Sequence, residues 1–211
     1  MITKNKKGKF EGFDYELWSQ MPEDYVRMNL TGGGTFSCDW NAYNALFRTG
    51  KRLGNKKNYK EYGSMTVDYA ATHKITSGDV SYLCLYGWTV DPLIEFYVVD
   101  NYFSYKPPGG KGFTGELELD GGVYEVFTDT RVEQPSIHGT KTFQQIFSVR
   151  KERRTEGVIT LSDHFKEWES MGFDVGGKLY EIALCVEGFR AEGSAVVNRH
   201  LMQIGGEVWG K

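Results

Sequence analysis

The segment DPLIEFYVVD, residues 91–100, predicts a strand whose two faces differ in chemistry. Side chains alternate along a strand, so Ile94, Phe96 and Val98 share one face, and Glu95 and Tyr97 share the other. The first face is apolar and predicts a buried core. The second face carries an acid and a phenol, which predicts a surface that uses them.

The size and charge of the chain narrow the classes of protein it can belong to. Its 211 residues suggest one domain with a large core. The net charge of −3 and the pI near 5.9 give no basic footprint, so we expect no nucleic-acid partner. No run is long and apolar enough to predict a membrane span. Aromatic residues make up 15% of the chain, and such rings suit strands and sugar-stacking platforms.

The cysteines and the N-terminus carry weaker signals. Cys38, Cys84 and Cys185 have neither metal-ligand spacing nor the pattern of a disulfide framework, which predicts three small buried residues. One disulfide stays open, because sequence cannot pair them. Residues 1–9 are lysine-rich without an apolar stretch, so they are not a complete signal peptide. We expect a solvated tail or, preferably, the start left after a leader is removed.

Short alternating segments separated by Gly, Asn and Asp dominate the rest of the chain. They lie at 33–43, 80–88, 93–100, 115–131, 142–150 and 180–189. Such spacing predicts a sandwich or barrel rather than a parallel sheet with helices. Between two of the strands, Asp120-Gly121-Gly122 is a strong hairpin signal.

One helix is predicted at about 162–171. Ser162 can cap it, Gly172 suits its end, and Phe165, Trp168 and Met171 fall three apart on one side. Residues 51–63, by contrast, are predicted to be a polar, solvated loop. No repeat or linker is visible.

Two more carboxylates share the pattern of Glu95. Alternation places Glu187 opposite Leu184 and Val186, and Asp39 opposite the apolar face of TFSCDW. Cleavage of a glycosidic bond needs one acid to protonate the leaving oxygen and one carboxylate to attack or to activate water. The pattern alone also fits single glutamates on exposed strand faces.

Four motifs in order resemble the endo-xylanases of glycoside hydrolase family 11. They are LYGWTVDPLIEFYVVDNYFSYKPPGG, QPSIHGTKTFQQIFSVR, DHFKEWESMGF and CVEGFRAEGSA. The similarity runs from about Gly12 to Gly205, and YEIALCVEGF is most similar to rumen-type members. It implies an all-β jelly-roll of two curved antiparallel sheets with a single α-helix, in which 10–211 is one catalytic domain. The concave face of the larger sheet would form the xylan cleft.

The resemblance also implies roles for the residues that match. Glu95 matches the nucleophile and Glu187 the general acid/base of an enzyme that retains anomeric configuration, in which the carboxyl groups stand about 5–5.5 Å apart. Contacts with substrate or with the catalytic pair are implied for Trp18, Tyr86, Tyr97, Tyr105, Arg131, Pro135, Ser136 and Gln145. Among these, Pro135 and Ser136 resemble the tip of a hairpin that closes over the cleft.

Asp39 matches a family position that is either Asn or Asp and that hydrogen-bonds the acid/base. A coupled carboxyl pair loses its protons in shared steps, so Asp at this position predicts an acidic pH optimum. The chain departs from the family at Ile146-Phe147, where many members have Tyr-Trp, and at Phe189, where many have Tyr. These departures affect the lining of the cleft and leave both glutamates in place.

Other functions remain open from the residues. A sugar-binding jelly-roll without catalysis would use the same aromatics, and a β-1,4-glucanase of the same architecture would use the same glutamates. A plain structural sandwich is the third alternative. For the xylanase we expect a secreted monomer that acts on xylan and xylo-oligosaccharides without metal or cofactor.

Overall fold

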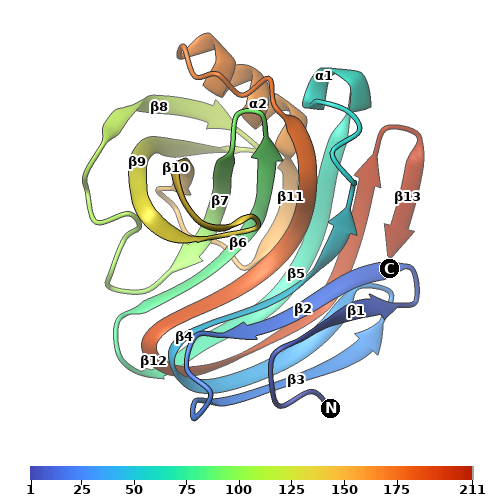
Figure 1. The fold of residues 1–211 in the computed structure, drawn as a ribbon, viewed down its shortest axis with the longest axis vertical. Coiled ribbons are helices and arrows are strands. Elements are labelled where there is room, and N and C mark those ends of the chain that lie inside the picture. Colours follow the sequence, from blue (N-terminus) through green and yellow to red (C-terminus); the bar gives the residue numbers. More distant parts are fainter. Residues whose placement is uncertain (211) are drawn as a thin grey trace.

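The computed structural model of the chain describes residues 1–210 and consists mainly of strands (Figure 1). The helices are α1 (Tyr59–Tyr62) and α2 (Leu161–Ser170). The strands are β1 (Lys6–Phe10), β2 (Phe13–Ser19), β3 (Tyr25–Gly32), β4 (Thr35–Arg52), β5 (Met65–Ser77), β6 (Val80–Val90), β7 (Ile94–Tyr102), β8 (Phe113–Leu119), β9 (Gly122–Ser136), β10 (Gly139–Arg150), β11 (Glu156–Thr160), β12 (Lys178–Ile204) and β13 (Glu207–Gly210). The predicted all-β class is confirmed.

Two long strands, β4 and β12, run through both layers of the fold. The main path is β1-β2-β4-β12-β6-β7-β10-β9-β8, and β3, β5, β11 and β13 pair alongside it. Along β12 the neighbour changes from β6 to β5 around Arg190, whose φ is 48°. The two curved layers of the jelly-roll are therefore joined as one hydrogen-bonded sheet. The sheet is not antiparallel throughout, since β7 and β10 are parallel.

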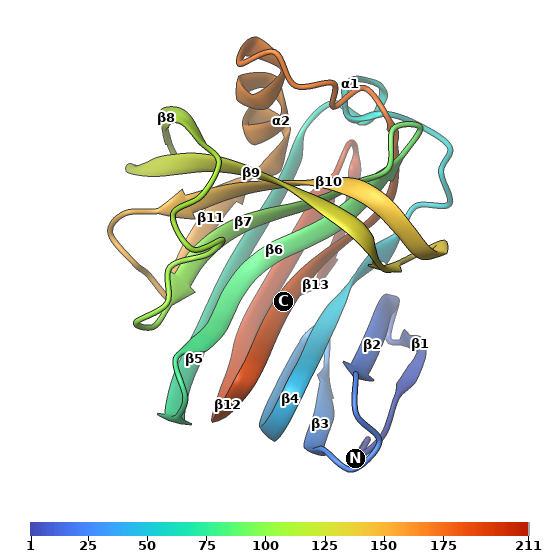
Figure 2. The ribbon, with the colours of Figure 1, turned by 60° about the vertical axis from the view of Figure 1, so that its left-hand side comes forward.

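The two faces of the larger layer bury different sets of side chains. Ile94, Phe96 and Val98 lie in the core between the layers with Leu184 and Val186, as alternation predicted. The opposite face, here called the concave face, buries a second cluster, in which aromatic rings predominate. Its members are Leu46, Tyr82, Cys84, Tyr86, Trp88, Tyr97, Val99, Phe127, Phe143, Phe147, Val149 and Cys185. Figures 1 and 2 show β8, β9 and β10 curling round toward β6 and β7, which makes this face concave.

Helix α2 packs on the core side of the sheet. Phe165 and Trp168 contact the ring of Phe96, which fixes the helix against β7. Gly172, at φ 90°, ends the helix, and the amides of residues 172 and 173 bond back to the carbonyls of Glu169 and Trp168. The predicted cap at Ser162 is wrong, because the helix begins one residue earlier. The Ser162 hydroxyl instead accepts a hydrogen bond from the backbone amide of Met65.

Two turn predictions differ in outcome. Asp120 and Gly121, at φ 53° and 69°, form the two-residue turn between β8 and β9, as the hairpin signal predicted. The polar loop predicted at 51–63 contains the one-turn helix α1, because Asn58 and Glu61 make a reciprocal capping box. Tyr59 anchors this turn on Phe165 with ring centroids 5.1 Å apart.

The N-terminal segment pairs with the sheet, and the three cysteines are buried within the fold. Residues 6–10 pair with β2 as an edge strand, so the structure differs here from the tail expected over 1–9. Lysines along such an exposed edge oppose pairing with other chains. Cys38, Cys84 and Cys185 are buried and free, as predicted, and no disulfide links them within residues 1–210.

Candidate active site

Strand β7 presents Glu95 to the concave face. Glu95 is buried, with only 8% of the residue exposed. Tyr86 Oη donates to Glu95 Oε1 at 2.8 Å, and Gln145 Nε2 donates to Oε2 at 2.6 Å. Gln145 stands directly opposite Glu95 on β10. Burial raises the pKa of Glu95, and both donors oppose this by stabilising the ionised form.

Strand β12 presents Glu187 to the same face. Ser81 Oγ donates to its carbonyl oxygen at 2.7 Å, and His73 Nε2 lies 2.8 Å from that hydroxyl. A Cβ on the next residue, Gly188, would come within 2.3 Å of Trp40 Nε1, so the backbone here needs glycine. Glu187 Oε2 is buried and has no partner among residues 1–210. Burial, followed by the charge of Glu95, raises the pKa of Glu187 to about 8.

Tyr97 and Arg131 act on both carboxyl groups. The Tyr97 hydroxyl and the Arg131 guanidinium each lower the pKa of Glu95 and of Glu187. Phe147 stacks on the Tyr97 ring at a centroid distance of 4.5 Å, which fixes the phenol between the two acids. The site therefore favours one ionised and one protonated carboxyl group near neutral pH.

Asp39 does not lie beside this pair. Arg27 bonds it with an N–O distance of 3.0 Å, and Tyr25 Oη donates to it at 2.9 Å. On β4 it stands opposite Ser194, in the layer that contains β3 and β5. The structure therefore contradicts the predicted contact between Asp39 and Glu187.

The reason is a change of facing along β4. Trp40 and Ala42 point to the core in the first half of the strand, but Ala45 and Phe47 do so in the second half. Alternation counted from Trp40 therefore cannot be carried past residue 42. Leu46 stands opposite Glu187, and Asn44 is two residues away on the same face.

Asn44 is a site residue that the sequence analysis missed. It stands opposite Phe189 on β12, and its Oδ1 is buried without a partner among residues 1–210. Diagonal neighbours in a sheet lie about 7–8 Å apart, which Asn and Glu side chains can bridge. The available signal was one amide inside the otherwise apolar strand YNALF.

Arg48 was also missed. It is only 7% exposed, and it donates to Glu181 Oε1 at 3.2 Å and to Glu16 Oε2 at 2.9 Å. Its guanidinium carbon lies 5.0 Å from the centroid of the Tyr86 ring, and Tyr86 in turn binds Glu95. A buried ion cluster thus supports the donor that holds Glu95 in place.

The remaining predicted residues surround the pair at different depths. Trp18 packs on the concave cluster from β2, opposite Leu46. Tyr105 follows β7 and is 37% exposed. Pro135 and Ser136 lie at the end of β9, where Ser136 Oγ donates to the Gly139 carbonyl at 2.6 Å and closes the hairpin.

The described residues were compared with the requirements of a metal site and of a membrane-spanning helix. Residues 1–210 contain no group of three or more His, Cys, Asp or Glu that could hold a metal ion. None of their helices combines the length and the apolar character of a membrane span.

A pair of glutamates on one concave face is the arrangement that glycoside hydrolases use. The family model of the glycosyl hydrolases family 11 matches residues 10–198. The chain belongs to this family. Glu95 and Glu187, which come from two of the motifs that resemble this family, both lie on the concave face.

Related proteins agree with this assignment. Endo-1,4-beta-xylanase A of Thermoclostridium stercorarium is 47% identical over 97% of this chain and 31% of its own length. Endo-1,4-beta-xylanase A of Bacillus pumilus is 44% identical over 97% of this chain and 87% of its own. The family 11 xylanase from Neocallimastix patriciarum has a TM-score of 0.89 at 36% identity, with 95% of each chain covered. The chain spans about a third of the length of the first two relatives it matches.

Proposed function

We propose that residues 10–211 are the catalytic domain of an endo-1,4-β-xylanase that cleaves internal bonds of xylan with retention of configuration. The observation that carries this proposal is that two acids on one face differ in the hydrogen bonds made to their carboxyl groups. Both oxygens of Glu95 accept hydrogen bonds, whereas Glu187 Oε2 has no partner within residues 1–210. The names of the relatives support xylan as the substrate.

In the first step the two acids act on one glycosidic bond. Ionised Glu95 attacks the anomeric carbon while protonated Glu187 gives its proton to the leaving oxygen. The C–O bond to the leaving chain breaks, and a glycosyl ester forms on Glu95. The raised pKa of Glu187 supports this role, because the acid must keep its proton until the bond breaks.

In the second step the roles reverse. Glu187, now ionised, takes a proton from water, and the resulting hydroxide attacks the anomeric carbon and releases Glu95. Esterification has removed the charge of Glu95, which was one cause of the raised pKa of Glu187. The pKa of Glu187 therefore falls when the residue must act as a base.

The pH dependence follows from these two groups. The first step needs ionised Glu95 and protonated Glu187, so activity falls below the raised pKa of Glu95 and above the pKa of Glu187, at about 8. The acidic optimum predicted from Asp39 loses its basis, because Arg27 and Tyr25 bind that residue elsewhere. The profile is instead bell-shaped between the two glutamates.

The surrounding residues receive roles in binding. Trp18 stacks a sugar on the glycone side, and Tyr105 does so on the aglycone side. Pro135 and Ser136, at the hairpin tip, close over the chain. Arg131 stabilises charge at the reacting centre. Because xylan is a polymer that cannot enter a cell, we also propose that the enzyme is secreted. We further propose that it acts as a monomer.

The test is release of reducing sugar from xylan and from carboxymethyl cellulose, by wild type, Glu95→Gln and the surface control Glu118→Gln. Wild type and Glu118→Gln should cleave xylan, and Glu95→Gln should lose the activity. The anomer formed first, read by proton NMR, should be β. Activity on cellulose would move the substrate to β-1,4-glucan, and binding of xylan without cleavage would leave a sugar-binding module.

A further inference from the structure

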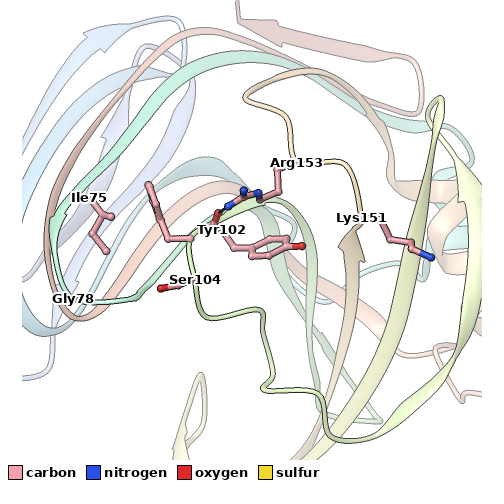
Figure 3. A pocket seen from close by; sticks show the side chains of 7 residues that line it. Ile75, Gly78, Tyr102, Ser104, Lys151 and Arg153 are labelled. Atoms are coloured by element: carbon pink, nitrogen blue, oxygen red, sulfur yellow. Dashed lines mark hydrogen bonds between the residues drawn. The ribbon is translucent and has the colours of Figure 1, made fainter.

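A pocket of about 660 Å³ lies away from the catalytic pair (Figure 3). Its walls come from the β5–β6 turn, from the end of β7 and from the segment after β10. The lining residues are Ile75, Gly78, Tyr102, Phe103, Ser104, Lys151 and Arg153. Figure 3 shows Arg153 beside Tyr102 near the centre, with Lys151 on the far side. Neither Glu95 nor Glu187 lines it.

The register of the sheet gives the position of the pocket relative to Glu187. Glu187 stands opposite Tyr82 on β6, and Tyr82 stands opposite Tyr102 on β7. Neighbouring strands are about 4.8 Å apart, so Tyr102 lies roughly 10 Å across the sheet from Glu187. The side chain of Tyr102 packs on the concave cluster. Ser104, which lines the pocket, directly precedes Tyr105, so the pocket lies beside the residue to which the proposed function gives the aglycone side.

The chemistry of the pocket combines an aromatic wall with a cation. The Arg153 guanidinium carbon is 5.4 Å from the Tyr102 ring centroid, and one nitrogen donates to the Tyr102 carbonyl at 2.9 Å. No carboxylate within residues 1–210 forms an ion pair with Arg153. By contrast, Lys151 Nζ is bound to Glu116 at 2.9 Å. The unused edge of the Arg153 guanidinium matches the two oxygens of a carboxylate.

We propose that this pocket binds a carboxylate-bearing sugar branch, such as a uronic acid, on the aglycone part of the xylan chain. The proposal rests on the proposed function and adds a determinant of substrate choice. Arg153 receives the branch carboxylate, and the rings of Tyr102 and Phe103 pack against the sugar. The enzyme therefore prefers to cut where an acidic branch lies at a fixed distance beyond the scissile bond.

The experiment compares acid-branched xylan with the same polymer after its carboxyl groups have been reduced to alcohols. Wild type, Arg153→Gln and Arg153→Lys are assayed on both polymers at low and high salt. We expect Arg153→Gln to lower kcat/KM about 3- to 10-fold on the acidic polymer at low salt, as for loss of a partly screened charged hydrogen bond. We expect no change on the reduced polymer and partial recovery in Arg153→Lys.

The products give an independent readout. The leaving chain gains a new non-reducing end at the cut, so its acidic branches should lie at one preferred spacing from that end. Arg153→Gln should broaden this spacing. Equal kcat/KM losses on both polymers, or unchanged products, would overturn the proposal while leaving the xylanase assignment intact. If wild type cleaves neither polymer, the proposed function fails first.

Discussion

Two carboxylates of this protein, the fully buried Asp100 and the half-buried Glu187, have opposite surroundings. Asp100 is fully buried and accepts hydrogen bonds from Tyr69 Oη, Tyr124 Oη and Arg154 Nε, each at 2.7 Å. Glu187 has a buried oxygen with no partner among residues 1–210, and a pKa raised to about 8. Both residues come from strands of the same sheet.

The difference shows that one sheet can hold a carboxylate with a structural role, Asp100, and an acid with a chemical role, Glu187. A buried anion with a full set of donors and a cation is stable in one protonation state and holds its neighbours together. An acid with a buried, unpartnered oxygen and a raised pKa can hold its proton near neutral pH and then give it up. The concave face thus contains an acid with a raised pKa, whereas the carboxylate on the core side of the sheet has a full set of partners.

The largest effect should come from Glu187→Gln, which mimics the protonated acid in shape but cannot give a proton. We expect kcat to fall about 10²- to 10⁴-fold, the usual contribution of general acid–base catalysis. The free energy of unfolding near neutral pH should stay the same or rise, because a buried carboxyl group is no longer present. Steady-state kinetics and urea titration check both parts, and strong destabilisation would contradict the comparison.

Asp100→Asn should produce the reverse result. It leaves Arg154 without its carboxylate and should lower the free energy of unfolding by about 3–5 kcal/mol, as when a buried pair is broken. The kcat of the folded fraction should change little. The matched control is Asp68→Asn at the partly exposed Arg199 pair, 3.0 Å long, which should cost at most about 1 kcal/mol. If fully folded Asp100→Asn showed a large loss of kcat, Asp100 would also contribute to catalysis, which contradicts this prediction.

Gln145→Leu should weaken the hold on Glu95, because it removes one of the two hydrogen-bond donors to its carboxyl group. A hydrogen bond to a charged group contributes about 1.5–3 kcal/mol, so kcat should fall about 10- to 100-fold. Without this donor the pKa of Glu95 rises further, so the acidic limb of the kcat/KM profile should move to higher pH. The alkaline limb, set by Glu187, should stay near its wild-type position. An unmoved acidic limb would contradict the role of Gln145.

The smallest effect is expected for Asp39→Asn. Because this residue is bound by Arg27 and Tyr25, both limbs of the pH profile should stay where they are. The matched variant is Asn44→Asp, which places a carboxyl group near Glu187. That pair must then share a proton, so the optimum should move to lower pH. Movement in Asp39→Asn would restore the original assignment, and an unmoved optimum in Asn44→Asp would contradict the placement of Asn44 near Glu187.

The local features of this protein could be predicted from its residues alone. Alternation in 91–100 separated the core face from the face of Glu95, and Asp120-Gly121 specified a hairpin, because both depend only on neighbouring residues. The motifs around Glu95 and Glu187 specified the family. Gly172 marked the end of α2 because a left-handed residue there favours glycine.

Which distant side chains meet depends on the three-dimensional fold and could not be predicted from local patterns. The change of facing between Ala42 and Ala45 placed Asn44, not Asp39, near Glu187, and no local pattern reveals where a strand passes between layers. The same holds for Arg48, whose partners Glu16 and Glu181 come from strands far apart in the chain. Burial and charge at the site depend on these long-range contacts, so the pKa of Glu187 is a property of the folded sheet.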